Sequence, residues 1–93
     1  MTNKRIALVT GGGSGMGAAC CLKLAEEGKV IAVLDINVDG AEQTAQHIRE
    51  QGGEAIVVKA DITQREDVDS AVQIIRQKLG PISVLVNCAG LED

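Results

Sequence analysis

Four short apolar runs alternate with longer segments in which apolar and polar residues are mixed. The runs occupy residues 5–9, 30–35, 55–59 and 83–87 and are rich in Val, Ile and Leu. Uninterrupted apolar runs of this length are typical of strands that are buried on both faces of a parallel sheet. The pattern therefore predicts four parallel strands.

The mixed segments predict amphipathic helices between the strands. We expect the first helix over residues 15–27, ending at Gly28, and the second over residues 39–51, with Asn37 as its cap and Gly52 at its end. The following residues form the apolar sides of these two helices: Ala18, Cys21, Leu22, Ala25, Ala41, Ala45 and Ile48.

The third helix has the clearest boundary signals in the sequence. Thr63 and Glu66 have the spacing of a capping box, in which each side chain satisfies a free amide of the first turn. Gly80 and Pro81 end the segment. Its apolar stripe has helical spacing and consists of Val68, Ala71, Val72, Ile75 and Leu79.

Strand–helix–strand alternation implies a parallel sheet with right-handed crossovers. We therefore predict an α/β fold, a partial doubly wound parallel sheet of Rossmann type with the element order β-α-β-α-β-α-β and the strand order 3-2-1-4. Residues 1–93 would form the amino-terminal part of a single domain. The fourth strand would be an exposed edge that invites self-association.

Composition narrows the classes of partner. The net charge is −4, and Lys and Arg form no run, which argues against nucleic acid and membrane surfaces as partners. No apolar stretch has the length of a membrane span and no signal peptide is evident, so we expect a cytoplasmic protein. The three cysteines, Cys20, Cys21 and Cys88, do not suggest a disulfide framework, and with His47 as the only histidine they do not suggest a metal site. We expect these cysteines to be small buried hydrophobic residues.

The candidate chemistry begins at a glycine-rich turn between the first strand and the first helix. Five of the seven residues 11–17 are glycine, and such a turn lets a diphosphate approach the backbone and the free amides of a helix N-terminus. The expected cofactor contacts in this turn are Gly11, Gly13, Ser14, Gly15, Met16 and Gly17.

Acidic residues follow the second and third strands. Asp35, next to Ile36, can accept both ribose hydroxyls of an adenosine and would repel a 2′-phosphate, which favours NAD over NADP. Asp61, next to Ile62, can accept from the adenine amino group, or it can begin the turn that Thr63 finishes; the residues alone leave both interpretations open.

The fourth strand ends in Asn87-Cys88-Ala89-Gly90, where small residues let a flat ring or ribose approach the backbone. Asn87 can tie this strand end to the glycine turn, and we expect a structural role for it rather than a chemical one. His47 lies on a solvated helix face, where we expect no catalytic role.

These landmarks together resemble the short-chain dehydrogenase/reductase family. Residues 10–17 match its Thr-Gly-x-x-x-Gly-x-Gly motif, Asp35 and Asp61 match its cofactor-contacting acids, and residues 87–90 resemble its Asn-Asn-Ala-Gly, with Cys88 in place of the second Asn. The resemblance covers the whole chain. It implies an oligomeric enzyme that transfers hydride between NAD(P) and an alcohol or carbonyl.

The family's catalytic Ser, Tyr and Lys lie beyond the matched motifs, and the chain contains no Tyr, Phe or Trp. No catalytic residue is therefore assigned, and the chain alone is expected to be inactive. The sequence leaves three functions open: the NAD-binding part of an oxidoreductase, a free-standing dinucleotide-binding module, or an inactive fragment. Beyond the glycine turn, the expected cofactor contacts are Asp35, Ile36, Asp61, Ile62, Asn87, Ala89 and Gly90.

Overall fold

The computed structural model describes residues 4–13 and 15–88. Within them, strands and helices alternate as β1 (Ile6–Thr10), α1 (Gly15–Glu26), β2 (Val30–Asp35), α2 (Val38–Glu50), β3 (Ala55–Lys59), α3 (Arg65–Lys78) and β4 (Ile82–Asn87). The predicted alternation is confirmed, and every bound predicted for the strands and for the first two helices lies within one residue of the observed one.

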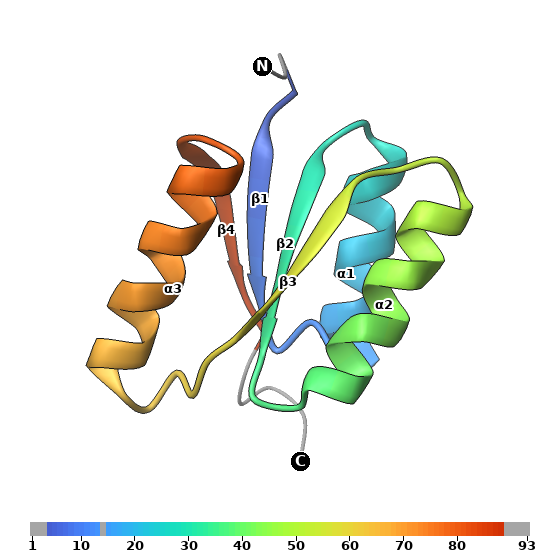
Figure 1. Ribbon diagram of the computed structural model, residues 1–93. Coiled ribbons are helices and arrows are strands. Elements are labelled where there is room, and N and C mark those ends of the chain that lie inside the picture. The colour runs from blue at the N-terminus through green and yellow to red at the C-terminus, as the bar shows by residue number, and fades with distance from the viewer. Residues whose placement is uncertain (1–3, 14, 89–93) are drawn as a thin grey trace.

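The strands form one parallel sheet in the order β3-β2-β1-β4, as predicted. Because all of them run in the same direction, their carboxyl ends lie at one edge, at the bottom of Figure 1. The chain passes from β1 to β2 on one side of β1 and later crosses to β4 on the other side. The topological switch point therefore lies between β1 and β4.

Helices cover both faces of the sheet (Figure 1). On the face of α1 and α2, Val9, Ile31 and Val33 pack with Ala45 and Ile48 of α2. On the opposite face, β-strand residues that include Leu8 and Leu34 pack with Ala71 and Ile75 of α3. The core is aliphatic on both faces, and the two apolar stripes predicted for α2 and α3 point into it.

The predicted capping box of α3 is wrong. The N-cap residue is Gln64, which makes no side-chain cap hydrogen bond. Thr63 instead turns back, and its hydroxyl and amide donate to Asp61 Oδ1 at 2.7 and 2.9 Å. The Asp61 carboxylate, two residues upstream, competes for Thr63 more locally than the first turn of the helix does. At α2, by contrast, Asn37 caps as expected and accepts from the Gly40 amide at 3.2 Å.

In the part of the chain that the structure describes, β4 is an outer strand of the sheet. Its side chains alternate between half-buried and exposed, and Leu85 is 65% exposed. An outer strand with exposed apolar side chains is a template for further strand pairing. Across residues 4–13 and 15–88 we find no helix long and apolar enough to cross a membrane.

Candidate functional site

The glycine turn lies at the carboxyl edge of the sheet, between the end of β1 and the start of α1. Gly11 has a positive φ of 70°, which an L side chain rarely adopts, and its amide donates to the Leu34 carbonyl of β2 at 2.8 Å. A Cβ on Gly17 would lie 1.8 Å from the Gly11 carbonyl oxygen. The turn therefore folds back onto the first turn of α1 so closely that position 17 has no room for a side chain.

This packing brings the N-terminus of α1 to the sheet edge. The first turn of α1 contains no acidic residue, so nothing in it offsets the positive end of the helix dipole. Gly15 and Met16 are exposed there, and Met16 is 56% exposed. Free amides at an uncompensated helix N-terminus are suited to binding a phosphate group. Ser14, which the sequence also placed in this site, lies outside the described residues.

Asp35 ends β2 directly beside the turn. Its Oδ2 accepts the Gly13 amide at 2.8 Å, and its Oδ1 accepts the Asn37 amide at 3.0 Å. A carboxylate has about four acceptor sites, so two amide donors leave capacity for further hydroxyl donors. The predicted neighbourhood of Asp35 and the glycine turn is therefore present, and Asp35 also begins the turn into α2.

Asp61 lies beside Asp35 across the sheet edge. A hollow of about 80 Å³ there is lined by Gly11, Asp35, Ile36, Ala60, Asp61 and Ile62. Ile36 and Ile62 are 58% and 38% exposed, so this hollow offers apolar surface to a flat ring next to polar acceptors.

The turn-forming interpretation of Asp61 is confirmed by its two hydrogen bonds from Thr63. Both bonds lower the pKa of the Asp61 carboxyl, and the bond from the Thr63 hydroxyl has a larger effect than the bond from the Thr63 amide. Both bonds use Oδ1. The adenine-binding interpretation is compatible with them and stays a prediction.

Asn87 joins β4 to the start of the glycine turn. The Thr10 hydroxyl donates to Asn87 Oδ1 at 2.6 Å, and the Cys88 amide donates to the Thr10 carbonyl at 3.1 Å. These bonds tie the two strands that flank the switch point, which is the structural role expected for Asn87. Ala89 and Gly90 lie outside the described residues.

The cysteines lie behind the turn. Cys21 and Cys88 are buried and Cys20 is half-buried, which fits the expectation of small hydrophobes for the first two. Cys88 Sγ lies 3.9 Å from Cys20 Sγ. Burial, with a smaller contribution from Cys20 and then Cys88, raises the pKa of the Cys21 thiol to about 12. No group of three or more His, Cys, Asp or Glu side chains suited to a metal ion occurs among the described residues.

Sequence reasoning missed two residues of α2 that pack against the turn. The Thr44 hydroxyl is buried and donates to the Gly12 carbonyl at 2.8 Å. A Cβ on Gly40 would lie 2.5 Å from the Gly13 carbonyl oxygen. The available signal was a threonine inside the apolar stripe of α2, since a buried hydroxyl there requires a partner.

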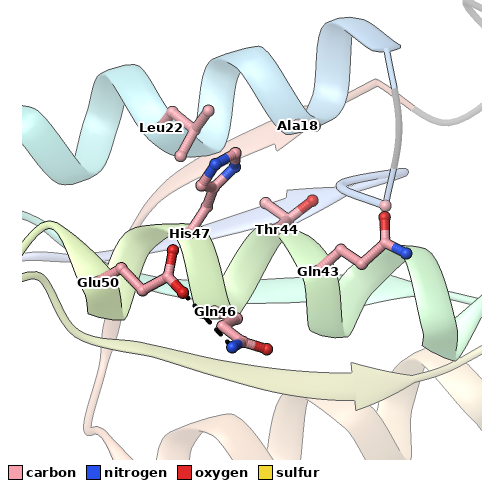
Figure 2. A pocket seen from close by; sticks show the side chains of 8 residues that line it. Ala18, Leu22, Gln43, Thr44, Gln46, His47 and Glu50 are labelled. Carbon is pink, nitrogen blue, oxygen red and sulfur yellow. Dashed lines mark hydrogen bonds between the residues drawn. The ribbon is translucent and has the colours of Figure 1, made fainter.

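A larger groove of about 540 Å³ lies between α1 and α2 and reaches the glycine turn at Gly13 (Figure 2). His47 of α2 points toward Leu22 of α1 across it, and Ala18, Gln43 and Gln46 are among its other lining residues. His47 is exposed, as predicted, and no catalytic partner is evident among the described residues around it. Its described lining includes neither Gly15 and Met16 at the start of α1 nor the carboxylates Asp35 and Asp61, so we assign the site to the sheet edge.

The edge therefore combines a glycine turn, a free helix N-terminus, a carboxylate held by that turn, and an apolar hollow at a topological switch point. A phosphate at the helix and a ribose at the carboxylate are neighbouring parts of an adenosine diphosphate. Fold and site together define a dinucleotide-binding α/β protein.

Comparison with known proteins narrows this class. The family model for short chain dehydrogenases matches residues 5–93. The chain is 39% identical over 88 residues to the short-chain dehydrogenase/reductase homolog YusS of Bacillus subtilis, covering 94% of this chain and 81% of YusS. It is 41% identical over 91 residues to the uncharacterized oxidoreductase YuxG of Bacillus subtilis, covering 96% of this chain. The chain therefore belongs to the short-chain dehydrogenase family.

Solved structures agree with this assignment. A hydroxysteroid dehydrogenase from Escherichia coli superposes with a TM-score of 0.87 at 32% identity, over 89% of this chain and 35% of that one. A putative D-mannonate oxidoreductase from Haemophilus influenzae, solved with bound NAD, gives a TM-score of 0.84 at 26% identity, over 87% of this chain and 29% of that one. The chain also spans 13% of the length of YuxG.

Proposed function

We propose that residues 1–93 form the amino-terminal, NAD-binding part of a single domain in an oxidoreductase. In the complete protein, the bound NAD would exchange a hydride with an alcohol or carbonyl substrate. The observation that carries this proposal is the Asp35 carboxylate, which the Gly13 amide holds at 2.8 Å beside the free N-terminus of α1. The family match, and a structural relative described as a hydroxysteroid dehydrogenase, support the reaction class.

Asp35 is the basis for proposing NAD rather than NADP. A carboxylate at the end of β2 accepts ribose hydroxyls and repels a 2′-phosphate. Its neighbour Ile36 is 58% exposed and supplies no cation that would offset this repulsion. The structural relative with bound NAD supports a cofactor of this type.

The proposal assigns cofactor binding to this chain and catalysis to residues outside it. The chain contains no tyrosine, so the acid–base step that the family resemblance implies has no donor here. We therefore expect NADH binding without turnover from this chain, and turnover only when the remaining part of the enzyme is supplied. We also propose a cytoplasmic location for the protein.

A free-standing dinucleotide-binding module is the second candidate function. The observation that favours it is YusS, a relative of which this chain covers 81%. This candidate predicts a stable monomer that binds NADH without a partner. An inactive fragment, the third alternative, predicts poor folding and no binding.

We further propose that the chain self-associates through β4, as part of a homo-oligomer or as an isolated piece. The support is the exposed edge of β4 and the 65% exposure of Leu85. Sedimentation tests this point, because a stable monomer at high micromolar concentration would contradict it.

Titration with NADH tests the central proposal. Protein emission is of no use because the chain lacks Trp and Tyr, so the emission of the cofactor itself is followed. We expect saturable binding that is tighter for NADH than for NADPH. Asp35→Ala should weaken NADH binding and reduce the discrimination against NADPH. Tighter binding of NADPH by the unaltered chain would refute the role of Asp35, and no binding of NADH at millimolar concentration would reject both binding functions.

A further inference from the structure

The buried hydroxyl of Thr44 is the strongest feature that the proposed function leaves unexplained. Thr44 is 5% exposed and lies in the apolar stripe of α2, between Ala41 and Ile48. Its Oγ1 lies 2.8 Å from the Gly12 carbonyl oxygen and 3.2 Å from the Gly40 carbonyl oxygen. A hydroxyl has a single proton, and the shorter distance assigns its donation to Gly12. Thr44 thus contacts the glycine turn across 32 residues of sequence.

The Gly12 carbonyl belongs to the same peptide group as the Gly13 amide. A trans peptide is planar, so its C=O and N–H point in opposite directions. The carbonyl of this peptide accepts from Thr44 at 2.8 Å, and its N–H donates to Asp35 Oδ2, also at 2.8 Å. Thr44 and Asp35 therefore hold one peptide plane from both sides, and rotation of that plane breaks both bonds.

The orientation of the Asp35 carboxylate depends on the same peptide. Its Oδ2 accepts from Gly13 and its Oδ1 from Asn37, so two amides on opposite oxygens fix the carboxylate plane. Hydrogen bonds to an ionised acceptor are stronger than neutral ones. Without the Gly13 amide, the Asn37 amide would be the one remaining hydrogen-bond donor to this carboxylate among the residues that the structure describes, and the carboxylate could rotate about that bond.

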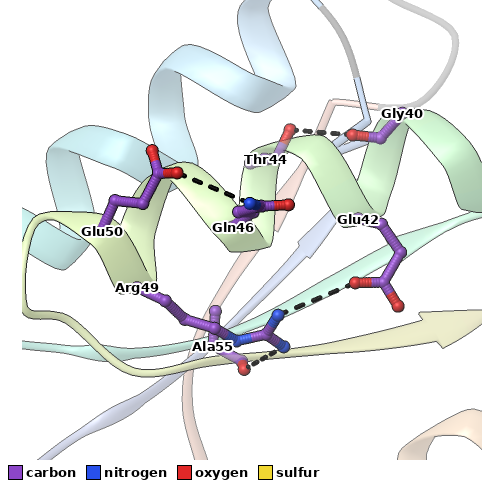
Figure 3. A network of polar contacts seen from close by, with 7 residues as sticks. All are labelled: Gly40, Glu42, Thr44, Gln46, Arg49, Glu50 and Ala55. Carbon is purple, nitrogen blue, oxygen red and sulfur yellow. Dashed lines mark hydrogen bonds and ion pairs between the residues drawn. The ribbon is translucent and has the colours of Figure 1, made fainter.

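The position of Thr44 is itself well determined, because α2 is anchored at both ends. Asn37 caps its first turn by accepting from the Gly40 amide. Near its other end, Arg49 Nη2 donates to the Ala55 carbonyl of β3 at 2.9 Å, and Arg49 Nη1 lies 3.7 Å from Glu42 Oε1 (Figure 3). Thr44 lies between these anchors and, as Figure 3 shows, its hydroxyl points back along the helix toward Gly40.

We propose that Thr44 is a positioning residue for cofactor choice: through the Gly12–Gly13 peptide it holds the Asp35 carboxylate in the orientation that selects NAD over NADP. This inference rests on the NAD site proposed above. It adds to the set that determines specificity a residue of α2 that supports the glycine turn from behind.

The test compares three variants of the chain by titration with NADH and NADPH. Thr44→Val keeps the shape of the side chain and removes the hydroxyl, whereas Thr44→Ser keeps the hydroxyl. We expect the ratio of the NADPH Kd to the NADH Kd to fall about 10-fold in Thr44→Val, the effect of losing one hydrogen bond to a charged group, and to be restored in Thr44→Ser. Ile48→Val is the matched control, because it loosens the same helix and removes neither the Thr44–Gly12 nor the Gly13–Asp35 hydrogen bond.

The ratio of the two Kd values separates a positioning role of Thr44 from a general loss of stability, because a loosened fold weakens the binding of NADH and NADPH alike. An unchanged ratio in Thr44→Val, when the unaltered chain binds NADH, would overturn the inference and leave the proposed function standing. Amide exchange of Gly13 gives a second measurement that needs no cofactor, and we expect it to be about 10-fold faster in Thr44→Val. If NADH does not bind but Gly13 responds in this way, the proposed function fails while the Thr44–Asp35 coupling remains; if Gly13 does not respond, the coupling is refuted.

Discussion

Gly17→Ala is the sharpest test of the glycine turn, because the structure fixes the size of the perturbation. The added Cβ would lie 1.8 Å from the Gly11 carbonyl oxygen, 2.6 Å from the Gly11 carbonyl carbon and 3.0 Å from Gly12 Cα. Real Cβ atoms essentially never come within 3.0 Å of another heavy atom, so the turn and the helix must separate by about 1.2 Å. All three contacts are with backbone, which cannot relieve the clash by changing a rotamer.

The backbone that must move is held by hydrogen bonds. Gly11 donates to Leu34 at 2.8 Å, and the Gly12 carbonyl accepts from Thr44 at 2.8 Å. Overpacking costs roughly 1–3 kcal/mol, and each broken hydrogen bond adds about 1 kcal/mol. We therefore expect Gly17→Ala to lower the free energy of unfolding by about 3 kcal/mol. The loss of about two charge-assisted bonds to a diphosphate would also raise the NADH Kd by roughly 100-fold.

Denaturant unfolding followed by circular dichroism measures the first effect, and cofactor emission measures the second. Gly28→Ala is the matched control. Gly28 lies at the far end of α1 with a φ of 92°, and nothing lies within 4 Å of an added Cβ. It should cost about 1 kcal/mol of backbone strain and leave the NADH Kd unchanged. A Gly17→Ala chain with ordinary stability and ordinary NADH binding would show that the close approach of the turn to α1 is not required.

Two further predictions follow from the shifted pKa values. Burial raises the pKa of the Cys21 thiol from an ordinary 9.0 to about 12, so the thiol ionises at a lower pH in the unfolded chain than in the folded one. The free energy of unfolding therefore falls above pH 9, by about 1.4 kcal/mol per pH unit. Urea unfolding should show that the free energy of unfolding falls by about 2 kcal/mol less between pH 8 and 10.5 in Cys21→Ala than in the unaltered chain. An equal fall in both chains would contradict the burial of this thiol. Thr63→Ala should raise the pKa of Asp61, measured by NMR titration of its carboxyl carbon, because the hydroxyl of Thr63 is the main cause of its lowering. The same variant should leave the stability of α3 nearly unchanged, whereas a loss of about 1 kcal/mol would restore Thr63 as a helix cap.

The parts of the site that could be predicted from the sequence all lie where a strand ends. The glycine turn, Asp35, Asp61 and Asn87 each follow an apolar run, and a parallel sheet brings the carboxyl ends of its strands to one edge whatever the loops between them do. Their neighbourhood therefore follows from strand order alone. The alternation of strands and helices implies right-handed crossovers, and the order 3-2-1-4 is that of the doubly wound class of sheets. The cap at Asn37 could also be predicted, because an N-cap side chain bonds to an amide only three residues away in the sequence.

Residue spacing gave the wrong prediction where two possible hydrogen-bond partners compete for the same side chain. Thr63 and Glu66 fit a capping box, yet the Thr63 hydroxyl bonds to Asp61, because a carboxylate two residues away at the end of the preceding strand is an equally close and more strongly accepting partner. The role of Thr44 could not be predicted because its hydrogen-bond partner lies 32 residues away in the sequence. Its helical spacing indicates only that it belongs to the apolar stripe formed by Ala41, Ala45 and Ile48. A polar residue in such a stripe signals that a distant acceptor exists, but the acceptor becomes identifiable only when the packing of α2 against the turn is known. Residues that orient a binding site from behind are therefore hidden in the sequence among core residues, whereas residues that contact the ligand lie at strand ends.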